Sequence, residues 1–153
     1  MNQIVGQTVL FLCTGNYYRS RFAEILFNHL ACERGMNWRA ESRGLNLKIG
    51  THNVGPLSVH ARSACAARGL ALPEPLRMPL AACEDDFTSA RLVIAVKEAE
   101  HRPYLSRLFP DWQDRVRYWH VHDLDAASAD VAMAALEALV RGLVNELASG
   151  IRP

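Results

Sequence analysis

The stretch VLFLCTGNYYRS, residues 9–20, decides the fold that we expect for this chain. Its apolar run from Val9 to Leu12 predicts a short buried strand, and the Thr-Gly-Asn that follows Cys13 predicts a tight turn. A helical pattern of apolar residues begins at Phe22. The first amides of a helix have no partner inside the helix and lie at the positive end of its dipole. A strand, a tight loop and a helix in this order therefore predict an anion-binding site.

A cysteine begins this loop and an arginine closes it, at Cys13 and Arg19. A thiolate at the start of a helix and beside a guanidinium is stabilised, so Cys13 is expected to be nucleophilic near neutral pH. The same amides and Arg19 would hold a phosphate-like dianion against the sulfur. Gly15 and Asn16 suit the loop because both tolerate the positive φ that lets successive N–H groups point inward. The alternative is a core cysteine buried at a strand end.

The loop resembles that of the low-molecular-weight protein tyrosine phosphatases, a family that includes some arsenate reductases. The family sequence is Cys-x-Gly-Asn-x-x-Arg-Ser, and the residues that match it are Cys13, Gly15, Asn16, Arg19 and Ser20. The resemblance implies a cysteine-dependent phosphomonoester hydrolase, and in particular a protein tyrosine phosphatase that forms a phosphocysteine intermediate. It implies no metal and no other cofactor. The phosphate-binding residues that it implies are Thr14, Gly15, Asn16, Tyr17, Tyr18, Arg19 and Ser20.

A general acid is expected after the last predicted strand, because a leaving alkoxide or phenoxide must gain a proton as the P–O bond breaks. The family has an aspartate at this place, and an alignment through Trp119 and Val121 assigns the role to Asp123. Asp125 remains a competitor, since Leu124 replaces the family's usual proline and no tyrosine follows. The catalytic residues implied in this way are Cys13, Arg19 and Asp123.

Three supporting features of the family are only partly present. Ser42 and Gly44 fit the Ser-x-Gly turn that lies beside the phosphate loop in the family. In the cleft wall, His52 and Asn53 stand where relatives often have an aromatic residue. The histidine and arginines that buttress the loop in relatives are represented by Arg77 alone.

Apolar stretches that alternate with helical patterns predict the architecture. Strands are expected at 9–12, 38–42, 90–96 and 116–121, and helices at 22–33, 58–68, 98–109 and from 128 onward. Ser58 and Ser128 are the expected N-caps of the second and last of these helices. This alternation predicts an α/β fold, a three-layer, doubly wound, four-stranded parallel sheet with helices on both faces. Ligands bind at the carboxyl ends of such strands, where the cysteine loop would lie. We expect a single low-molecular-weight phosphatase-like domain over residues 1–153.

The amino-acid composition limits the classes of binding partner that we expect. The formal net charge is +1, with 17 basic and 16 acidic residues, so nothing indicates nucleic acid or an anionic membrane as a partner. The expected partner is a phosphorylated protein or a small phosphate ester. No apolar run is long enough to span a membrane and no signal-peptide pattern begins the chain, and four scattered cysteines favour a cytoplasmic location. The sequence does not define the physiological substrate or the oligomeric state.

Two other functions fit the loop. A phosphate- or phosphopeptide-binding module with degraded catalysis would account for the missing proline, tyrosines and histidine. An arsenate reductase would need further thiols, but Tyr18 stands where relatives often have a second cysteine. Cys32, Cys65 and Cys83 lie far apart in the sequence, without the close pairing of cysteines that a thiol relay requires. These features favour a phosphatase.

A metal-based alternative comes from His120 and His122, which would share one face of a strand. Two imidazoles and the carboxylate of Asp125 could bind one metal, as in a metallohydrolase. No other cluster of histidine and aspartate supports this interpretation, so the cysteine chemistry is preferred.

Overall fold

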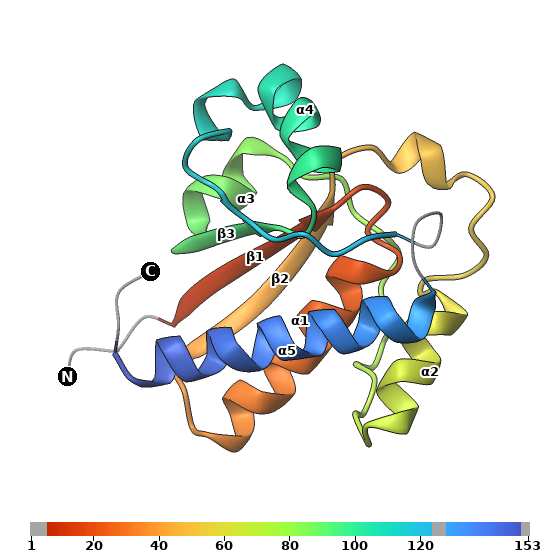
Figure 1. Cartoon of the computed structure of the whole chain (residues 1–153), viewed down its shortest axis with the longest axis vertical. Coiled ribbons are helices and arrows are strands. Elements are labelled where there is room, and N and C mark those ends of the chain that lie inside the picture. Colours follow the sequence, from red (N-terminus) through yellow and green to blue (C-terminus); the bar gives the residue numbers. More distant parts are fainter. Residues whose placement is uncertain (1–5, 124–127, 151–153) are drawn as a thin grey trace.

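The computed structural model describes residues 6–123 and 128–150, and a four-stranded sheet of order β2-β1-β3-β4 forms its centre (Figure 1). Every pair of neighbouring strands is parallel. The strands are β1 (Gln7–Cys13), β2 (Trp38–Gly44), β3 (Leu92–Ala95) and β4 (Arg117–Tyr118). The helices are α1 (Arg19–Glu33), α2 (Val59–Ala67), α3 (Glu84–Ser89), α4 (Glu98–Leu108) and α5 (Ala129–Ala148). Short 3-10 turns are η1 (Leu47–Gly50) and η2 (Pro110–Trp112).

Helices cover both faces of the sheet, with α1, α2 and α5 on one side and α3 and α4 on the other (Figure 1). Side chains of β1 alternate between two cores, as the period of a strand requires. Val9 and Phe11 pack in the core with α1 and α5, whereas Leu10 and Leu12 pack in the core with α3 and α4. A strand that is buried on both faces appears in the sequence as a continuous apolar run. The predicted three-layer α/β fold is confirmed.

Three elements differ from the expectation. Helix α1 begins at Arg19, before Phe22, because its first turn has buried polar side chains that apolar periodicity does not detect. Only Arg117 and Tyr118 pair with β3 as a strand, so the predicted strand at 116–121 is largely an extended segment. Helix α3 was not expected. Its signal was the acidic run after Cys83, since acidic residues favour a first helical turn.

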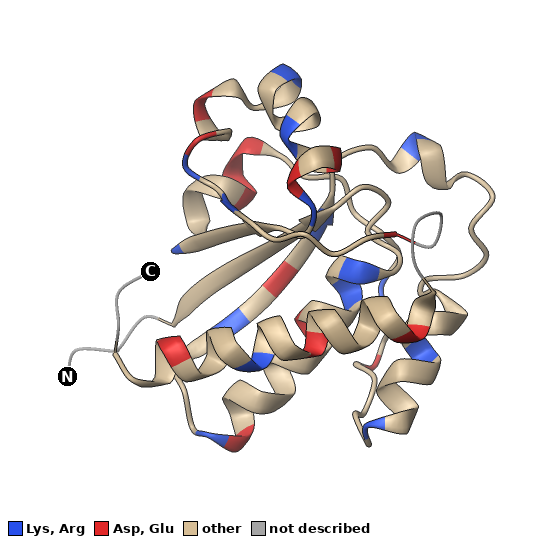
Figure 2. Cartoon of the chain, viewed as in Figure 1, with Lys and Arg blue, Asp and Glu red and all other residues tan. Residues whose placement is uncertain are grey.

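Two predicted helix caps are present. The Ser58 hydroxyl accepts a hydrogen bond from the His60 amide (3.1 Å), and the Ser128 hydroxyl accepts one from the Val131 amide (3.3 Å). Acidic and basic residues are intermixed over the elements (Figure 2). None of the helices in the described part of the chain has the length and apolar character that crossing a membrane requires.

Candidate active site

The loop between β1 and α1 forms the floor of a pocket of about 590 Å³. Cys13 is the last residue of β1, and the first hydrogen bond of the helix joins the Phe22 amide to the Tyr18 carbonyl (3.1 Å). The amides before Phe22 are therefore not used inside the helix. Asn16 has a φ of 52°, in the left-handed region, whereas Gly15 does not have a positive φ. Of the two residues expected to tolerate a positive φ, only Asn16 uses one.

Cys13 lines this pocket, and its sulfur lies 2.9 Å from the hydroxyl oxygen of Ser20. The Asn16 amide nitrogen donates to the same hydroxyl oxygen, also over 2.9 Å. Because Asn16 donates to that oxygen, the hydroxyl hydrogen of Ser20 remains available for the sulfur. Ser20 can therefore stabilise a thiolate at Cys13 by donating to it.

Asn16 and Ser20 do not line the pocket, but their hydrogen bonds stabilise the loop between β1 and α1. Besides Ser20, the Asn16 Nδ2 donates to the Ser42 hydroxyl (2.9 Å). Its Oδ1 accepts from the Arg77 guanidinium and from the Leu80 amide, each over 3.0 Å. Asn16 is fully buried, so these bonds satisfy its side chain and fix the left-handed turn. Arg77, the buttress suggested by the sequence, lies in contact with the loop.

The end of β2 also supports the loop. The Leu45 amide donates to the Cys13 carbonyl (2.9 Å). At Gly44, a Cβ atom would lie 2.7 Å from the Thr14 carbonyl oxygen and 3.1 Å from the Asn16 nitrogen. Both contacts are with backbone, which cannot turn away as a side chain would. A residue larger than glycine at this position would displace the loop between β1 and α1.

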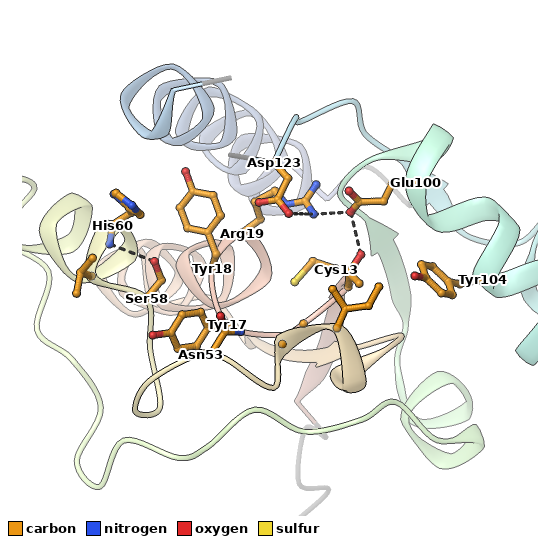
Figure 3. Close-up of a pocket in the computed structure, with 15 residues that line it drawn as sticks. Cys13, Tyr17, Tyr18, Arg19, Asn53, Ser58, His60, Glu100, Tyr104 and Asp123 are labelled. Atoms are coloured by element: carbon orange, nitrogen blue, oxygen red, sulfur yellow. Dashed lines mark hydrogen bonds and ion pairs between the residues drawn. The ribbon is translucent and has the colours of Figure 1, made fainter. Parts of the chain in front are cut away.

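The Arg19 guanidinium reaches the pocket from the first turn of α1 and is buried, with 2% of the side chain exposed (Figure 3). Its Nη1 donates to the Val121 carbonyl (2.9 Å). Its Nη2 forms an ion pair with Glu100 and lies 3.5 Å from the Asp123 carboxylate. Burial would lower the pKa of Arg19, but the negative charges of Cys13, Asp123 and Glu100 outweigh it, and the pKa is raised. Arg19 is therefore a permanent cation in the pocket.

Glu100 and His101, in the first turn of α4, are site residues that the sequence interpretation missed. The Thr14 hydroxyl donates to Glu100 Oε2 (2.9 Å), and His101 Nε2 lies 2.7 Å from the same oxygen. Burial would raise the pKa of Glu100, but the hydrogen bond from His101 and the charge of Arg19 lower it well below its ordinary value. The available signal was position, because α4 begins at the carboxyl edge of the sheet.

Asp123 lines the pocket and faces Arg19 (Figure 3). Its competitor, Asp125, lies outside the described residues. Asp125 was also the third ligand of the metal alternative, with His120 and His122, so that alternative stays untested; within residues 6–123 and 128–150 no group of three or more possible metal ligands occurs.

Aromatic residues and the segment around η1 form the walls of the pocket. The Tyr17 hydroxyl donates to the Val54 carbonyl (2.5 Å) and so links the loop between β1 and α1 to the segment around η1. Tyr18 packs edge-on against His60, with ring centroids 6.1 Å apart. Of the two residues expected in the cleft wall, Asn53 lines the pocket and His52 does not. The full lining is Cys13, Thr14, Gly15, Tyr17, Tyr18, Arg19, Ile49, Gly50, Asn53, Ser58, Val59, His60, Glu100, Tyr104 and Asp123.

The fold and this pocket define a class of protein: an α/β fold with a thiol and a guanidinium lining one pocket at the carboxyl end of the sheet. A sequence model of the family described as low molecular weight phosphotyrosine protein phosphatase matches residues 8–149. This chain belongs to that family. It is a cysteine-dependent phosphatase, an enzyme class that works through a phosphoenzyme intermediate.

Individual relatives agree with this assignment. A protein-arginine-phosphatase of Bacillus subtilis (strain 168) is 32% identical over 108 residues, which cover 71% of this chain and 67% of that protein. The crystal structure of a YwlE mutant from Bacillus subtilis matches with a TM-score of 0.75 and 27% identity, covering 93% of this chain and 99% of that one. A YwlE arginine phosphatase mutant with a phosphorylated active-site serine matches with a TM-score of 0.75 and 25% identity. That match covers 92% of this chain and 95% of that one.

Proposed function

We propose that Cys13 is the nucleophile, that Arg19 and the loop amides bind the phosphoryl oxygens, and that Asp123 is the general acid. The observation that carries this proposal is the pocket itself. It brings the Cys13 sulfur, with its hydrogen-bond partner Ser20 at 2.9 Å, together with the Arg19 guanidinium and the Asp123 carboxylate. A nucleophile, an oxyanion site and a proton donor are the groups that phosphate ester cleavage requires.

In the first step the Cys13 sulfur forms a bond to phosphorus while the P–O bond to the leaving group breaks. Asp123 donates its proton to the leaving oxygen. In the second step the Asp123 carboxylate takes a proton from water, and the water oxygen attacks phosphorus as the S–P bond breaks. Phosphate leaves and the thiolate returns, stabilised by Ser20. Arg19 and the amides from Thr14 onward bind the equatorial oxygens, where charge lies in the transition state.

The proposed acid is tested by Asp123→Asn. We expect kcat for phenyl phosphate to fall about 100-fold, with a smaller loss for p-nitrophenyl phosphate, whose leaving group needs less protonation. The measurement is kcat for both esters, and the ratio of the two losses reports the proton donated to the leaving group.

Asp114→Asn is the matched control, since this carboxylate is exposed and pairs with Arg102 outside the pocket. Its kcat should stay within about twofold of the wild-type value. If Asp123→Asn kept its kcat for both esters while Asp125→Asn lost it, Asp125 would be the acid.

For the substrate, we infer a phosphorylated side chain of a protein, with phosphotyrosine as the first candidate. Tyr17, Tyr18 and Tyr104 line a pocket large enough for a phosphorylated ring. Exposed aliphatic side chains near the mouth, at Ile49 and Val59, offer contacts to residues beside the phosphorylated one.

Phosphoarginine is the second candidate. The 32% identical relative is a protein-arginine-phosphatase. The carboxylates of Glu100 and Asp123 both line the pocket, and negative charge there would favour a guanidinium leaving group.

Two peptides of identical sequence, one with phosphotyrosine and the other with phosphoarginine, distinguish these substrates. We expect kcat/KM to be about tenfold higher for the phosphotyrosine peptide, because the tyrosines that line the pocket can pack against an aromatic ring. Phosphate release from each peptide is the measurement, with p-nitrophenyl phosphate as the reference substrate. The opposite ratio would assign the enzyme to phosphoarginine.

We also propose a cytoplasmic location. The four cysteines, Cys13, Cys32, Cys65 and Cys83, are all free, which suits a reducing compartment.

A further inference from the structure

The pocket contains a second carboxylate, that of Glu100, for which the proposed reaction gives no role. Its Oε2 atom forms an ion pair with Arg19 Nη2 (Figure 3). The same oxygen accepts from the Thr14 hydroxyl (2.9 Å) and lies 2.7 Å from His101 Nε2. Three partners on one oxygen leave the carboxylate little rotational freedom. Glu100 is ionised at any pH at which the enzyme would be assayed, since His101 and Arg19 hold its pKa low. It is therefore unsuited to donate a proton.

His101 anchors this carboxylate in a defined direction. The Lys97 amide donates to His101 Nδ1 (3.1 Å), so Nδ1 is the acceptor nitrogen of the ring. The proton of a neutral imidazole then lies on Nε2, which is 2.7 Å from Glu100 Oε2 and 3.1 Å from the Thr14 hydroxyl oxygen. His101 is fully buried, and burial lowers its pKa, which keeps the ring in this neutral form. A backbone amide at the start of α4 thus orients His101, and His101 orients Glu100.

Arg19 is consequently held from two separate elements. Its Nη1 donates to the Val121 carbonyl (2.9 Å), beyond β4, and its Nη2 pairs with Glu100 on α4. A guanidinium is planar, so anchoring both terminal nitrogens fixes the plane of the group. Of its five N–H donors, these two contacts use one each and leave others for an oxyanion.

We propose that Glu100 is a positioning residue, whose carboxylate holds the Arg19 guanidinium in the plane in which it grips the phosphoryl oxygens. This inference rests on the proposed role of Arg19 as the phosphate-binding cation. Glu100 acts before substrate arrives, so the site does not have to order the arginine side chain during the reaction. Its effect should be larger in the transition state than in the ground state, because the equatorial oxygens demand a defined donor geometry.

The test compares Glu100→Ala with Glu100→Gln and with the control Glu98→Ala. Glu98 lies in the same helical turn, pairs with Arg102 and does not line the pocket. For Glu100→Ala we expect kcat for p-nitrophenyl phosphate to fall about 100-fold, with KM changed less than about threefold. Inhibition by vanadate, which takes up a transition-state-like geometry, should weaken far more than inhibition by phosphate.

Glu100→Gln retains an oxygen that accepts from Arg19 and is expected to recover about tenfold of the lost kcat. Glu98→Ala should match the wild type in kcat and in vanadate inhibition. Partial unfolding alone would reduce the concentration of active enzyme but leave the vanadate inhibition constant unchanged. That constant therefore separates positioning from a structural role.

A Glu100→Ala enzyme with wild-type kcat, or with a lower kcat and an unchanged vanadate constant, would overturn the inference and leave the proposed function intact. If Glu100→Ala does not fold, the same two measurements are made on Glu100→Gln, for which we expect a loss of about tenfold in kcat and a weaker inhibition by vanadate. A wild-type protein that shows neither turnover nor a phosphoenzyme would overturn the proposed function, and the inference with it.

Discussion

Cys13→Ser is expected to lower kcat for p-nitrophenyl phosphate by at least about 10⁴-fold. A serine hydroxyl is not ionised near neutral pH, and the atom 2.9 Å from the Cys13 sulfur is another hydroxyl, that of Ser20, rather than a base. The substitution therefore replaces an activated nucleophile with an unactivated one. The measurements are steady-state turnover and the mass of the acid-quenched enzyme, in which the wild type should carry one phosphoryl group on Cys13.

Cys65→Ser is the matched control. This thiol is also buried, but it lies on α2 outside the pocket, and burial raises its pKa to about 11, so it stays protonated. The variant should keep its kcat within about twofold, even if its stability falls by roughly 1 kcal/mol. Activity above about 1% of the wild type in Cys13→Ser would refute the nucleophile assignment. Tight phosphate binding by a wild-type protein without turnover would indicate a binding module instead.

Arg19→Lys should lower kcat/KM about 1000-fold. The guanidinium makes two directional contacts, with the Val121 carbonyl and the Glu100 carboxylate. In its proposed role, its remaining N–H donors would form a planar fork for the phosphoryl oxygens. An ammonium group is a single point charge, so it can pair with Glu100 or with phosphate but cannot form the fork. Charge is conserved in this variant, and the expected loss therefore measures geometry rather than net charge. Turnover and the vanadate inhibition constant are the measurements.

Arg68→Lys controls for the general effect of replacing an arginine that pairs with a carboxylate. Arg68 forms an ion pair with Glu137 (2.9 Å) and does not line the pocket. We expect its Tm to fall by a few degrees, with kcat/KM within about twofold. An Arg19→Lys enzyme within about tenfold of the wild type would mean that the loop amides alone bind the oxyanion.

Local segments of the sequence were enough for much of the fold. The apolar run at 9–12 predicted β1, and the serines before α2 and α5 marked where those helices begin. Features that depend on contacts between distant segments were not predicted from the local sequence. The pattern at 116–121 predicted a full strand, but Arg117 and Tyr118 alone continue the sheet. Beyond them, His120 forms an antiparallel bridge to Lys97, and the Trp119 amide donates to the Ala95 carbonyl (2.9 Å). These contacts depend on the neighbouring segment and not on local propensity.

The sequence alone determined the loop that we propose to bind phosphate. Cys13, Asn16, Arg19 and Ser20 belong to one short segment, so the geometry of a strand, a turn and a helix start is sufficient to bring them together. Only the tertiary structure decided what surrounds them. The order β2-β1-β3-β4 puts the carboxyl ends of β1 and β3 side by side, which sets Glu100 against Arg19 across 81 positions of sequence. The pairing of β1 with β3 brings Arg19 and Glu100 together, and no sequence pattern within either segment predicts this contact.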